Sequence, residues 1–360
     1  MLFESVRLGS LDLANRVVMA PMTRCRADHR DAVPNAMMAE YYRQRAGAGL
    51  IISEGVPVSD NARGYLNTPG LWNEAQAEGW GQVTAAVHGA RGRIFAQIWH
   101  CGRIAHSRLH ADASLPVGPS AIAARAEAFI IGPQGLESVP CETPHALSEA
   151  EIAGVVGDFA RAARLARDAG FDGIEIHGAN GYLLDQFRCP FVNRRSDRYG
   201  GSLENRCRLL FEVVDAVTAV WEPERVCVRQ SPGGTFNDMQ PDPDPLGTYT
   251  YVAGELDRRG IGLLHLYDQG ETWIHRGDPL FAAVRAAYRG ALVVCGGFDR
   301  DKAEAALARG ADLVAFGKPL ISNPDLVERM RRRLPWAPWQ ANSFYAPGPA
   351  GYIDYSPLAA

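Results

Sequence analysis

The 360-residue sequence has no long hydrophobic run, no paired-cysteine motif and almost no lysine. No apolar stretch approaches the roughly 18 residues that a membrane-spanning helix needs, and residues 1–16 carry too many charges for a secretory signal. The seven cysteines are scattered and odd in number, so neither a zinc ribbon nor a disulfide framework is predicted. We therefore expect a protein of the reducing cytoplasm without a membrane partner.

A basic surface and metal-binding spacings are also missing. The formal net charge is −4, whereas a dedicated nucleic-acid binder needs a basic face to neutralise phosphates. The nine histidines form no His-x-His and no His-Glu-x-x-His motif. The sequence therefore predicts neither a nucleic-acid partner nor a catalytic metal.

What the sequence does contain is a series of short apolar runs. Each is rich in Val, Ile or Leu, which is typical of strands buried on both faces. The runs are RVVMAPM (16–22), GLIISEG (49–55), RIFAQIWH (93–100), GIEIHG (173–178), RVCVRQS (225–231), LLHLYD (263–268), ALVVCGG (291–297) and LVAFGKP (313–319).

Helical patterns lie between these runs. The clearest covers 148–170, where Ser148 and Glu151 form a capping-box signature and Gly170 ends the pattern. Another helix is predicted to begin with Asn323 as N-cap and Pro324 in its first turn. Further helices are expected near 39–48, 73–90, 202–221, 246–259, 279–289 and 299–309.

Eight strands that alternate with helices predict an α/β protein with a single (β/α)8 TIM barrel over residues 1–360. A doubly wound open sheet would give a similar alternation. Residues 1–16 are expected to form an N-terminal hairpin at the bottom of the barrel. Residues 101–147, after strand three, are too long for a plain loop and are expected to form a lid or hairpin over the top.

The C-terminal ends of the strands carry the candidate functional residues, because active sites of such barrels lie there. Gly296 and Gly297 follow strand seven, and Gly317 and Lys318 follow strand eight. Backbone N–H groups near helix starts bind phosphate, and glycine lets the backbone approach it. The alternative is a pair of glycine turns beside a surface lysine.

Two polar residues lie inside strand patterns. Arg229 in strand five needs an anionic or planar partner, which is either the polar end of a ligand or a carboxylate such as Glu54 or Glu175. Gln97 in strand three hydrogen-bonds either a ligand ring or the surrounding core. Trp99, at the end of the same strand, packs against the core or against a ligand.

Strand four ends at His177, which is followed closely by Asn180 and Tyr182. A spacing of three places His177 and Asn180 on one side of a helical turn. Two donors aimed at one point hold a carbonyl oxygen and stabilise charge that develops on it, and Tyr182 has a proton to donate. Packing or turn formation explains each residue alone, whereas the three together favour a functional pocket.

Six motifs follow one another along the chain, namely NRVVMAPMTR (15–24), GLIISEG (49–55), AQIWHCGR (96–103), HGANGYLLDQF (177–187), NRRSDRYGGSLENR (193–206) and FGKPLISNPDL (316–326). Together they resemble the old yellow enzyme family of flavin-dependent ene-reductases. The resemblance implies a barrel that holds FMN non-covalently and takes electrons from NADPH or NADH. It also implies a substrate that is an enone, an enal or a related activated alkene.

The resemblance assigns roles to the strand-end residues. Those expected to bind the cofactor are Pro21, Met22, Thr23, Gly55, Gln97, Arg229, Gly296, Gly297, Gly317 and Lys318. Thr23 is expected at the flavin O4 edge and Arg229 at the N1/O2 edge, and the last four residues of that set are expected at the phosphate. Lys318 stands where the family usually has arginine.

The resemblance also implies the catalytic residues. His177 and Asn180 are expected to grip the substrate carbonyl while hydride passes from flavin N5 to the β-carbon, and Tyr182 then donates a proton. Trp99 and Tyr345 are expected to line the substrate pocket. Trp273 belongs to a loop, 268–278, that matches no family pattern and is expected to border the pocket mouth.

An alternative is a flavin-free barrel isomerase or aldolase that acts on a phosphorylated metabolite. It would share the phosphate site, but it needs a Schiff-base lysine or a carboxylate base at a strand end. The chain has only Lys302 and Lys318, and the second is already assigned to phosphate. Either a monomer or a homodimer is compatible with the sequence.

Overall fold

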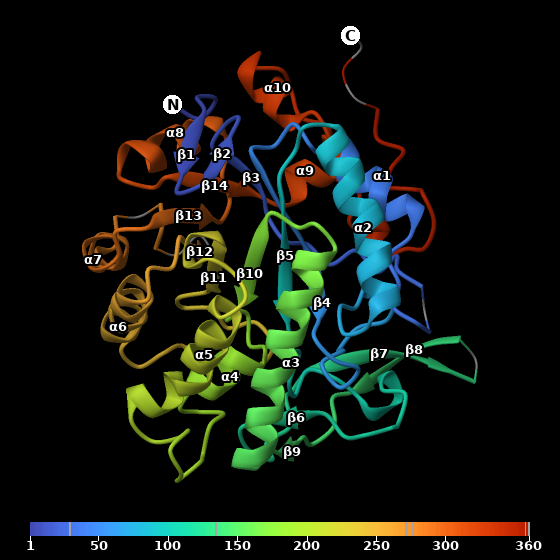
Figure 1. Cartoon of the computed structure of the whole chain (residues 1–360), viewed down its shortest axis with the longest axis vertical. Helices are drawn as coiled ribbons and strands as arrows, with labels where there is room; N and C mark the ends of the chain where they lie inside the picture. Colours follow the sequence, from blue (N-terminus) through green and yellow to red (C-terminus); the bar gives the residue numbers. More distant parts are fainter. Residues whose placement is uncertain (29, 134, 271–272, 276, 357, 359–360) are drawn as a thin grey trace.

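The computed structural model describes residues 1–28, 30–133, 135–270, 273–275, 277–356 and 358. Its centre is a closed barrel of eight parallel strands (Figure 1). In spatial order these are β3 (Val17–Met19), β4 (Leu50–Pro57), β5 (Ile94–Trp99), β10 (Gly173–His177), β11 (Val226–Gln230), β12 (Leu263–Tyr267), β13 (Ala291–Cys295) and β14 (Leu313–Phe316). Each matches a predicted run, so the (β/α)8 barrel is confirmed and the open sheet is excluded.

Helices surround the barrel close to the predicted ranges. They are α1 (Ala36–Gln44), α2 (Glu74–Gly89), α3 (Glu149–Asp168), α4 (Leu183–Arg188), α5 (Leu203–Thr218), α6 (Pro245–Arg258), α7 (Pro279–Ala287), α8 (Arg300–Ala308), α9 (Lys318–Ser322) and α10 (Leu326–Arg331). The predicted capping box of α3 is present, because Ser148 and Glu151 each accept a backbone N–H of the other. Among the described residues, none of these helices is long and apolar enough to cross a bilayer.

One predicted helix start is wrong. Asn323 is the C-cap of α9, and α10 begins only after Asp325. The Asn323 side chain accepts from the Ala337 backbone N–H at 2.7 Å and donates to the carbonyls of Pro319 and Ala337. It therefore joins the end of α9 to the chain beyond α10 and is not available to cap a helix that follows it.

Both predicted additions to the barrel are hairpins. β1 (Val6–Leu8) pairs antiparallel with β2 (Leu11–Leu13), and Leu11 and Leu13 pack into the cluster inside the barrel. Within 101–147, β7 (Glu127–Gly132) pairs antiparallel with β8 (Gly135–Pro140), and β6 (Val117–Gly118) pairs with β9 (His145–Ala146). Ala128 of β7 is buried with Trp99 and Tyr182, so this excursion packs beside the C-terminal ends of the strands.

The barrel interior changes from apolar to polar along the strands. The apolar part includes Val18, Leu50, Phe95, Leu263 and Leu313. Closer to the C-terminal ends, buried polar side chains replace them at Gln97, Glu175, Arg229 and His265. Because alternate residues of a strand face the same side, these four side chains all face the barrel interior below its mouth, with Gln97 and Glu175 one inward position deeper than Arg229.

Buried arginines hold the C-terminal segment against the barrel mouth. Arg24 donates to the carbonyls of Phe344 at 3.1 Å and Gly351 at 2.8 Å. Arg26 donates to the carbonyls of Ser343, Phe344, Gly348 and Ala350. Tyr352 is fully buried and stacks on Tyr41 of α1 at 4.1 Å between ring centroids.

Candidate active site

Four aromatic rings form a cluster at the C-terminal ends of β5 and β10. Trp99 ends β5 and stacks on His177, which ends β10, at 5.8 Å between centroids. Tyr182 packs edge-on against both rings, at 4.7 and 5.1 Å. Its hydroxyl is 2.9 Å from the hydroxyl of Tyr65, whose ring stacks on Trp99. The structure therefore brings together three of the predicted site residues around one aromatic wall.

Asn180, three residues after His177, has an unusual backbone conformation. The predicted helical turn is wrong, because Asn180 has φ +58 in the loop between β10 and α4. Its backbone N–H donates to Ser231 Oγ at 2.8 Å, and its carbonyl accepts from Asn237 Nδ2 at 2.8 Å. The next residue, Gly181, also has positive φ and donates to Asp185 at 2.9 Å. Contacts from three segments thus fix a strained turn.

The protonation states of His177 and Tyr182 follow from their burial. Burial, together with the nearby Arg229, lowers the pKa of His177 to about 3, so its imidazole is neutral at physiological pH. Burial, with a smaller effect of Cys101, raises the pKa of Tyr182 well above its ordinary value. At neutral pH both side chains therefore act as uncharged hydrogen-bonding groups, and Tyr182 retains its phenolic proton.

Several buried polar atoms in this region have no hydrogen-bond partner among the described residues. They are Trp99 Nε1, His177 Nδ1, Asn180 Oδ1 and Arg229 Nε. Native structures satisfy nearly all buried polar groups, so a cluster of unsatisfied ones marks a place for a polar ligand or ordered water. The residues present therefore fit a ring that carries donors and acceptors, as a flavin does.

Arg229 has no ion pair within the described part of the chain, although it is only 5% exposed. Its guanidinium lies 4.9 Å from the ring centroid of Tyr267. Of the two predicted carboxylate partners, Glu54 accepts from Tyr42 and the Arg24 backbone, and Glu175 accepts from other side chains. The salt-bridge alternative is thus wrong, and the cation is left for a ligand.

Gln97 and Gly55 are fixed by neighbouring side chains. Gln97 donates from Nε2 to Glu175 at 2.7 Å. Its amide nitrogen is therefore hydrogen-bonded within the core, which was one of the two predicted alternatives. At Gly55, a Cβ atom would lie 2.6 Å from the indole ring of Trp99. Gly55 therefore lets the Trp99 ring lie flat against β4, beside His177.

The predicted phosphate-binding residues lie together after β13 and β14. Gly296 and Gly297 have φ of +142 and +57, and a Cβ at Gly296 would lie 2.6 Å from the Asp268 carbonyl oxygen. Gly317 directly precedes α9, and Lys318 is exposed with its Nζ 5.9 Å from the ring centroid of Trp339. This pairing leaves the Lys318 ammonium in solvent, where an anion can reach it.

The remaining predicted residues lie farther out. Pro21 is buried and Met22 and Thr23 are half-buried in the turn after β3. Tyr345 is 67% exposed. It is one of the groups that, after burial itself, raise the pKa of Tyr182, which places it near the barrel mouth.

Trp273 does not join the aromatic wall. It is buried, its indole N–H donates to the Pro232 carbonyl at 3.1 Å, and its backbone is bound by Asp268. It lines a separate cavity of about 460 Å³ together with Phe281 of α7. Residues 271–272 and 276 of the same loop lie outside the described residues. This placement gives no support to its assignment to the substrate pocket.

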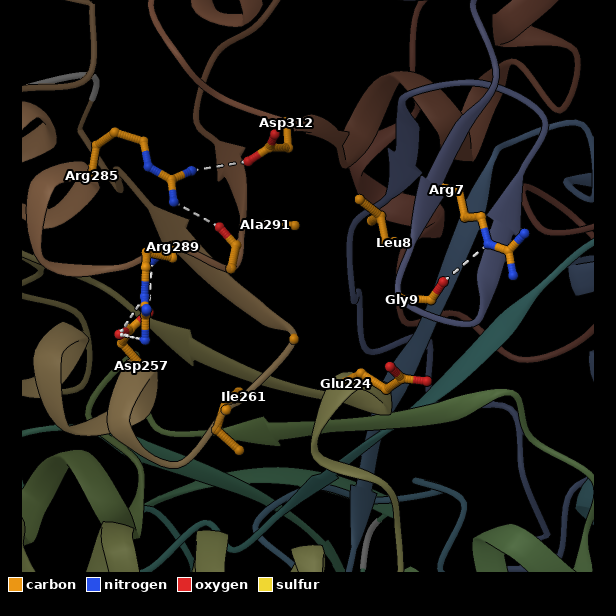
Figure 2. Close-up of a pocket in the computed structure, with 13 residues that line it drawn as sticks. Arg7, Leu8, Gly9, Glu224, Asp257, Ile261, Arg285, Arg289, Ala291 and Asp312 are labelled. Atoms are coloured by element: carbon orange, nitrogen blue, oxygen red, sulfur yellow. Dashed lines mark hydrogen bonds and ion pairs between the residues drawn. The ribbon is translucent and has the colours of Figure 1, made fainter.

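A larger cavity lies at the opposite end of the barrel and is not the candidate site. It has a volume of about 600 Å³ and is lined by residues that precede the strands, including Glu224 and Asp312 (Figure 2). Four of its charged groups pair with one another, because Arg285 pairs with Asp312 at 3.0 Å and Arg289 with Asp257 at 2.9 Å. None of the predicted site residues lines it.

Two features of the site were not predicted from the sequence. Tyr65 lies in the long connection between β4 and α2, where no periodic pattern points to it. The contact between Glu175 and His265 joins residues 90 positions apart, and both lie in runs that read as buried strands. For Glu175 and His265 the available signal was a polar residue inside a buried strand run, but the sequence does not show that the two meet. For Tyr65 the sequence offered no such signal.

Comparison with known proteins decides the family. The model of the NADH:flavin oxidoreductase / NADH oxidase family matches residues 1–336. The chain belongs to this family. Relatives in the family include 12-oxophytodienoate reductase 2 of Arabidopsis thaliana, which is 37% identical over 99% of this chain and 96% of its own length. A probable flavin mononucleotide-dependent alkene reductase of Leishmania infantum is 40% identical over 98% of this chain and 96% of its own.

Solved structures of the family agree over the whole fold. Morphinone reductase in complex with tetrahydroNAD is 45% identical, with a TM-score of 0.95 over 99% of this chain and 98% of its own. The old yellow enzyme homologue from Zymomonas mobilis is 39% identical, with a TM-score of 0.93 over 99% of both chains. The predicted family is thus confirmed, and the chain is an FMN-dependent oxidoreductase with a nicotinamide reductant. Nothing supports the flavin-free isomerase or aldolase.

Proposed function

We propose that this enzyme reduces the activated C=C bond of α,β-unsaturated carbonyl compounds, and that His177, Asn180 and Tyr182 carry the substrate chemistry. One observation carries this proposal: unpartnered buried polar atoms of His177, Asn180 and Arg229 lie at the mouth of a family barrel. A ligand carbonyl oxygen would accept from His177 Nδ1–H and from the Asn180 side-chain amide nitrogen, and a polar ring would accept from Arg229 Nε–H. Asn180 Oδ1 is an acceptor, so it would take a donor of the ligand or of an ordered water.

FMN fits the residues that lie below His177 and Asn180. Arg229 would meet the N1/O2 edge of the ring, Thr23 the O4 edge, and Gln97 the ring's polar atoms. Gly296, Gly297, Gly317 and Lys318 would hold the phosphate through backbone N–H groups and one cation. When bound, FMN accepts two electrons from NAD(P)H and passes them to the alkene.

His177 and Asn180 would act on the substrate carbonyl. Both are held before the substrate arrives, His177 by stacking on Trp99 and Asn180 by Ser231 and Asn237. Negative charge grows on the carbonyl oxygen as the β-carbon is reduced. Donors already oriented toward that oxygen stabilise it without reorganisation, which is worth roughly 3–4 kcal/mol for each donor.

Tyr182 would supply the proton to the α-carbon. Its raised pKa keeps the phenol protonated until the substrate accumulates charge. Tyr65, 2.9 Å away, orients that hydroxyl and is positioned to pass a proton back to it afterwards. Trp99, whose ring packs against Tyr182 at 4.7 Å and His177 at 5.8 Å, would line the same space.

The experiment that tests this proposal separates the two half-reactions. Purified protein with FMN should be yellow, should be bleached by NADPH or NADH without oxygen, and should recover its colour with 2-cyclohexenone. Tyr182→Phe should leave the bleaching near normal and slow the recovery about 10²-fold or more. Equal slowing of both steps would refute the assignment of Tyr182, and a protein that binds no FMN would refute the whole proposal.

The preferred reductant, the oligomeric state, the cellular location and the domain organisation are also part of this proposal. Parallel bleaching rates with NADPH and NADH would give the preferred reductant, and light scattering would distinguish a monomer from a homodimer. Seven unpaired cysteines, six of them buried, are consistent with a cytoplasmic enzyme. We also keep the prediction that the 360 residues act as one domain, since the site draws on segments from Thr23 to Tyr345.

A further inference from the structure

A fully buried carboxylate lies one layer below the proposed flavin site, and the reaction described above does not use it. Glu175 faces into the barrel from β10, two residues before His177. It accepts from Gln97 Nε2 at 2.7 Å, from His265 Nδ1 at 2.7 Å and from Cys227 Sγ at 3.3 Å. Three donors from three other strands converge on this one side chain.

These contacts favour a negative charge on Glu175. Burial opposes ionisation, but His265, Arg229 and Gln97 outweigh it and lower the pKa of Glu175 below its ordinary value. Burial also lowers the pKa of His265, despite the opposing effect of Glu175. The pair is therefore a carboxylate that accepts the Nδ1–H of a neutral imidazole.

Arg229 is the cation that faces this charge. In the register of β10 and β11, Glu175 lies opposite Cys227, and His177 lies opposite Arg229. The carboxylate is thus one inward position below the guanidinium. It forms no ion pair with Arg229 within 4.0 Å in the described structure, yet Arg229 contributes to its lowered pKa. The two charges interact within a buried barrel core, where the effective dielectric is lower than in water.

We infer that Glu175 is a positioning residue that lowers the reduction potential of bound FMN by offsetting part of the positive charge of Arg229. The inference rests on the proposed placement of Arg229 at the N1/O2 edge. Uptake of two electrons and one proton adds one negative charge to the flavin, and the guanidinium favours that charge. The carboxylate below opposes it, and Gln97 and His265 keep the carboxylate in place and ionised.

The potential of bound FMN sets how much driving force remains for each half-reaction, reduction of FMN by NAD(P)H and its reoxidation by an alkene. Without the offset, FMN would be reduced more readily by NAD(P)H and would give up its electrons less readily to an alkene. Glu175 therefore favours the second half-reaction, which is the one that defines an alkene reductase. A purely structural role would give no such opposite effects on the two steps.

The test is the midpoint potential of FMN in the holoenzyme, measured by anaerobic dye titration at pH 8. Glu175→Gln should make the potential more positive than in the wild type and should slow reoxidation by 2-cyclohexenone without slowing reduction by NADPH. Glu175→Asp retains the charge and should restore a potential close to that of the wild type. A wild-type potential in Glu175→Gln would overturn the inference.

Glu54 provides a matched control. It is a second fully buried carboxylate, but it faces α1 and accepts from Tyr42 and the Arg24 backbone. Burial raises the pKa of Glu54 to about 7, so at pH 8 it is ionised as well. Glu54→Gln should leave the potential unchanged, and a shift as large as that of Glu175→Gln would remove the specificity that the inference requires.

Two further variants keep the result interpretable. If Glu175→Gln does not fold, His265→Leu removes one donor, weakens the ionisation of Glu175 and should shift the potential in the same direction by less. An unchanged potential in His265→Leu would then overturn the inference. Arg229→Met should lower the potential. An unchanged potential in Arg229→Met would contradict the proposed placement of Arg229. If Arg229→Met lowers the potential while Glu175→Gln leaves it at the wild-type value, only the role of Glu175 is refuted.

Discussion

At the scale of single residues, the site combines two kinds of fixed donor. His177 is held by aromatic stacking at the end of a strand, whereas Asn180 is held by backbone hydrogen bonds in a left-handed conformation. Neither side chain depends on a charge, because the pKa of His177 is lowered to about 3 by burial and by Arg229. The grip on a carbonyl should therefore be insensitive to pH in the neutral range.

If His177 and Asn180 bind one ligand oxygen together, loss of both side chains should weaken ligand binding. His177→Ala combined with Asn180→Ala should weaken the binding of p-hydroxybenzaldehyde as its phenolate by roughly 10²–10⁴-fold, since two hydrogen bonds to a charged oxygen are lost. Titration of the change in flavin absorbance on ligand addition would measure this affinity. Unchanged affinity would contradict the pairing of the two residues.

His100 predicts a dependence of stability on pH. It is buried, its Nδ1 accepts the Gly102 N–H at 3.0 Å, and burial, followed by His110, lowers its pKa to about 3. The unfolded state binds a proton below about pH 6.5 that the folded state does not, so stability falls as pH decreases through that value.

The matching variant is His100→Asn, which keeps an acceptor but does not titrate. Between pH 7 and pH 5 the wild type should lose about 2 kcal/mol more free energy of unfolding than this variant. Urea denaturation at the two pH values measures the difference. An equal loss in both proteins would show that His100 does not contribute.

At the scale of elements, the loop between β10 and α4 carries the site and is anchored from behind. Asp185 of α4 accepts the Gly181 N–H and pairs with Arg188, which also lies 3.8 Å from Asp242. The Arg188 guanidinium lies 4.5 Å from the ring centroid of Tyr249. This buried network fixes the start of α4 and thereby the positions of Asn180 and Tyr182.

Loss of one charge in that network should be costly. Asp185→Asn leaves a buried arginine with only its more distant carboxylate and should lower the free energy of unfolding by about 3 kcal/mol. Glu40→Gln is the control, because Glu40 pairs with Arg43 at the surface and should cost less than about 1 kcal/mol. Chemical denaturation compares the two, and equal costs would contradict the anchoring role.

Comparison of the predicted and observed helices and strands shows how much of the structure the sequence alone predicts. The β-branched runs located all eight strands, because strands buried on both faces leave little choice of residue. The Asn-Pro pair at 323–324 misled the assignment of α9 and α10, because the Asn323 side chain bonds to Ala337, a partner that no local pattern reveals. The site was predicted at the level of strand ends, but the Tyr65–Tyr182 contact and the Glu175 network depend on pairings set only by barrel closure.

At the scale of the whole molecule, the segment after the first barrel strand and the C-terminal segment meet beside the barrel mouth. The turn after β3 holds the C-terminal segment through Arg24 and Arg26, and this segment carries Tyr345 to the barrel mouth. The 101–147 excursion covers the other side of Trp99 and Tyr182. The mouth is therefore built from the strand ends together with two segments, 101–147 and the C-terminal segment, that lie outside the eight barrel repeats.

The hydrogen bonds of Arg26 to the C-terminal segment predict that Arg26→Met makes this segment easier to cleave. The carbonyls of Ser343, Gly348 and Ala350 would lose their charged donor, and the Phe344 carbonyl would keep only Arg24. Segment 343–352 should therefore open more often. Limited proteolysis should cleave within 336–352 about tenfold faster than in the wild type. Arg331→Met, at an exposed ion pair on α10, is the control and should leave the cleavage rate unchanged.

The central claim is that His177 and Asn180 hold an oxygen above a flavin whose N1/O2 edge meets Arg229. A crystal structure of the FMN complex with p-hydroxybenzaldehyde tests it most directly. The account predicts that the phenolate oxygen lies within hydrogen-bond distance of both side chains and that the Arg229 guanidinium contacts the pyrimidine edge of the ring. A phenolate bound elsewhere, or a flavin whose dimethylbenzene end faces Arg229, would contradict it.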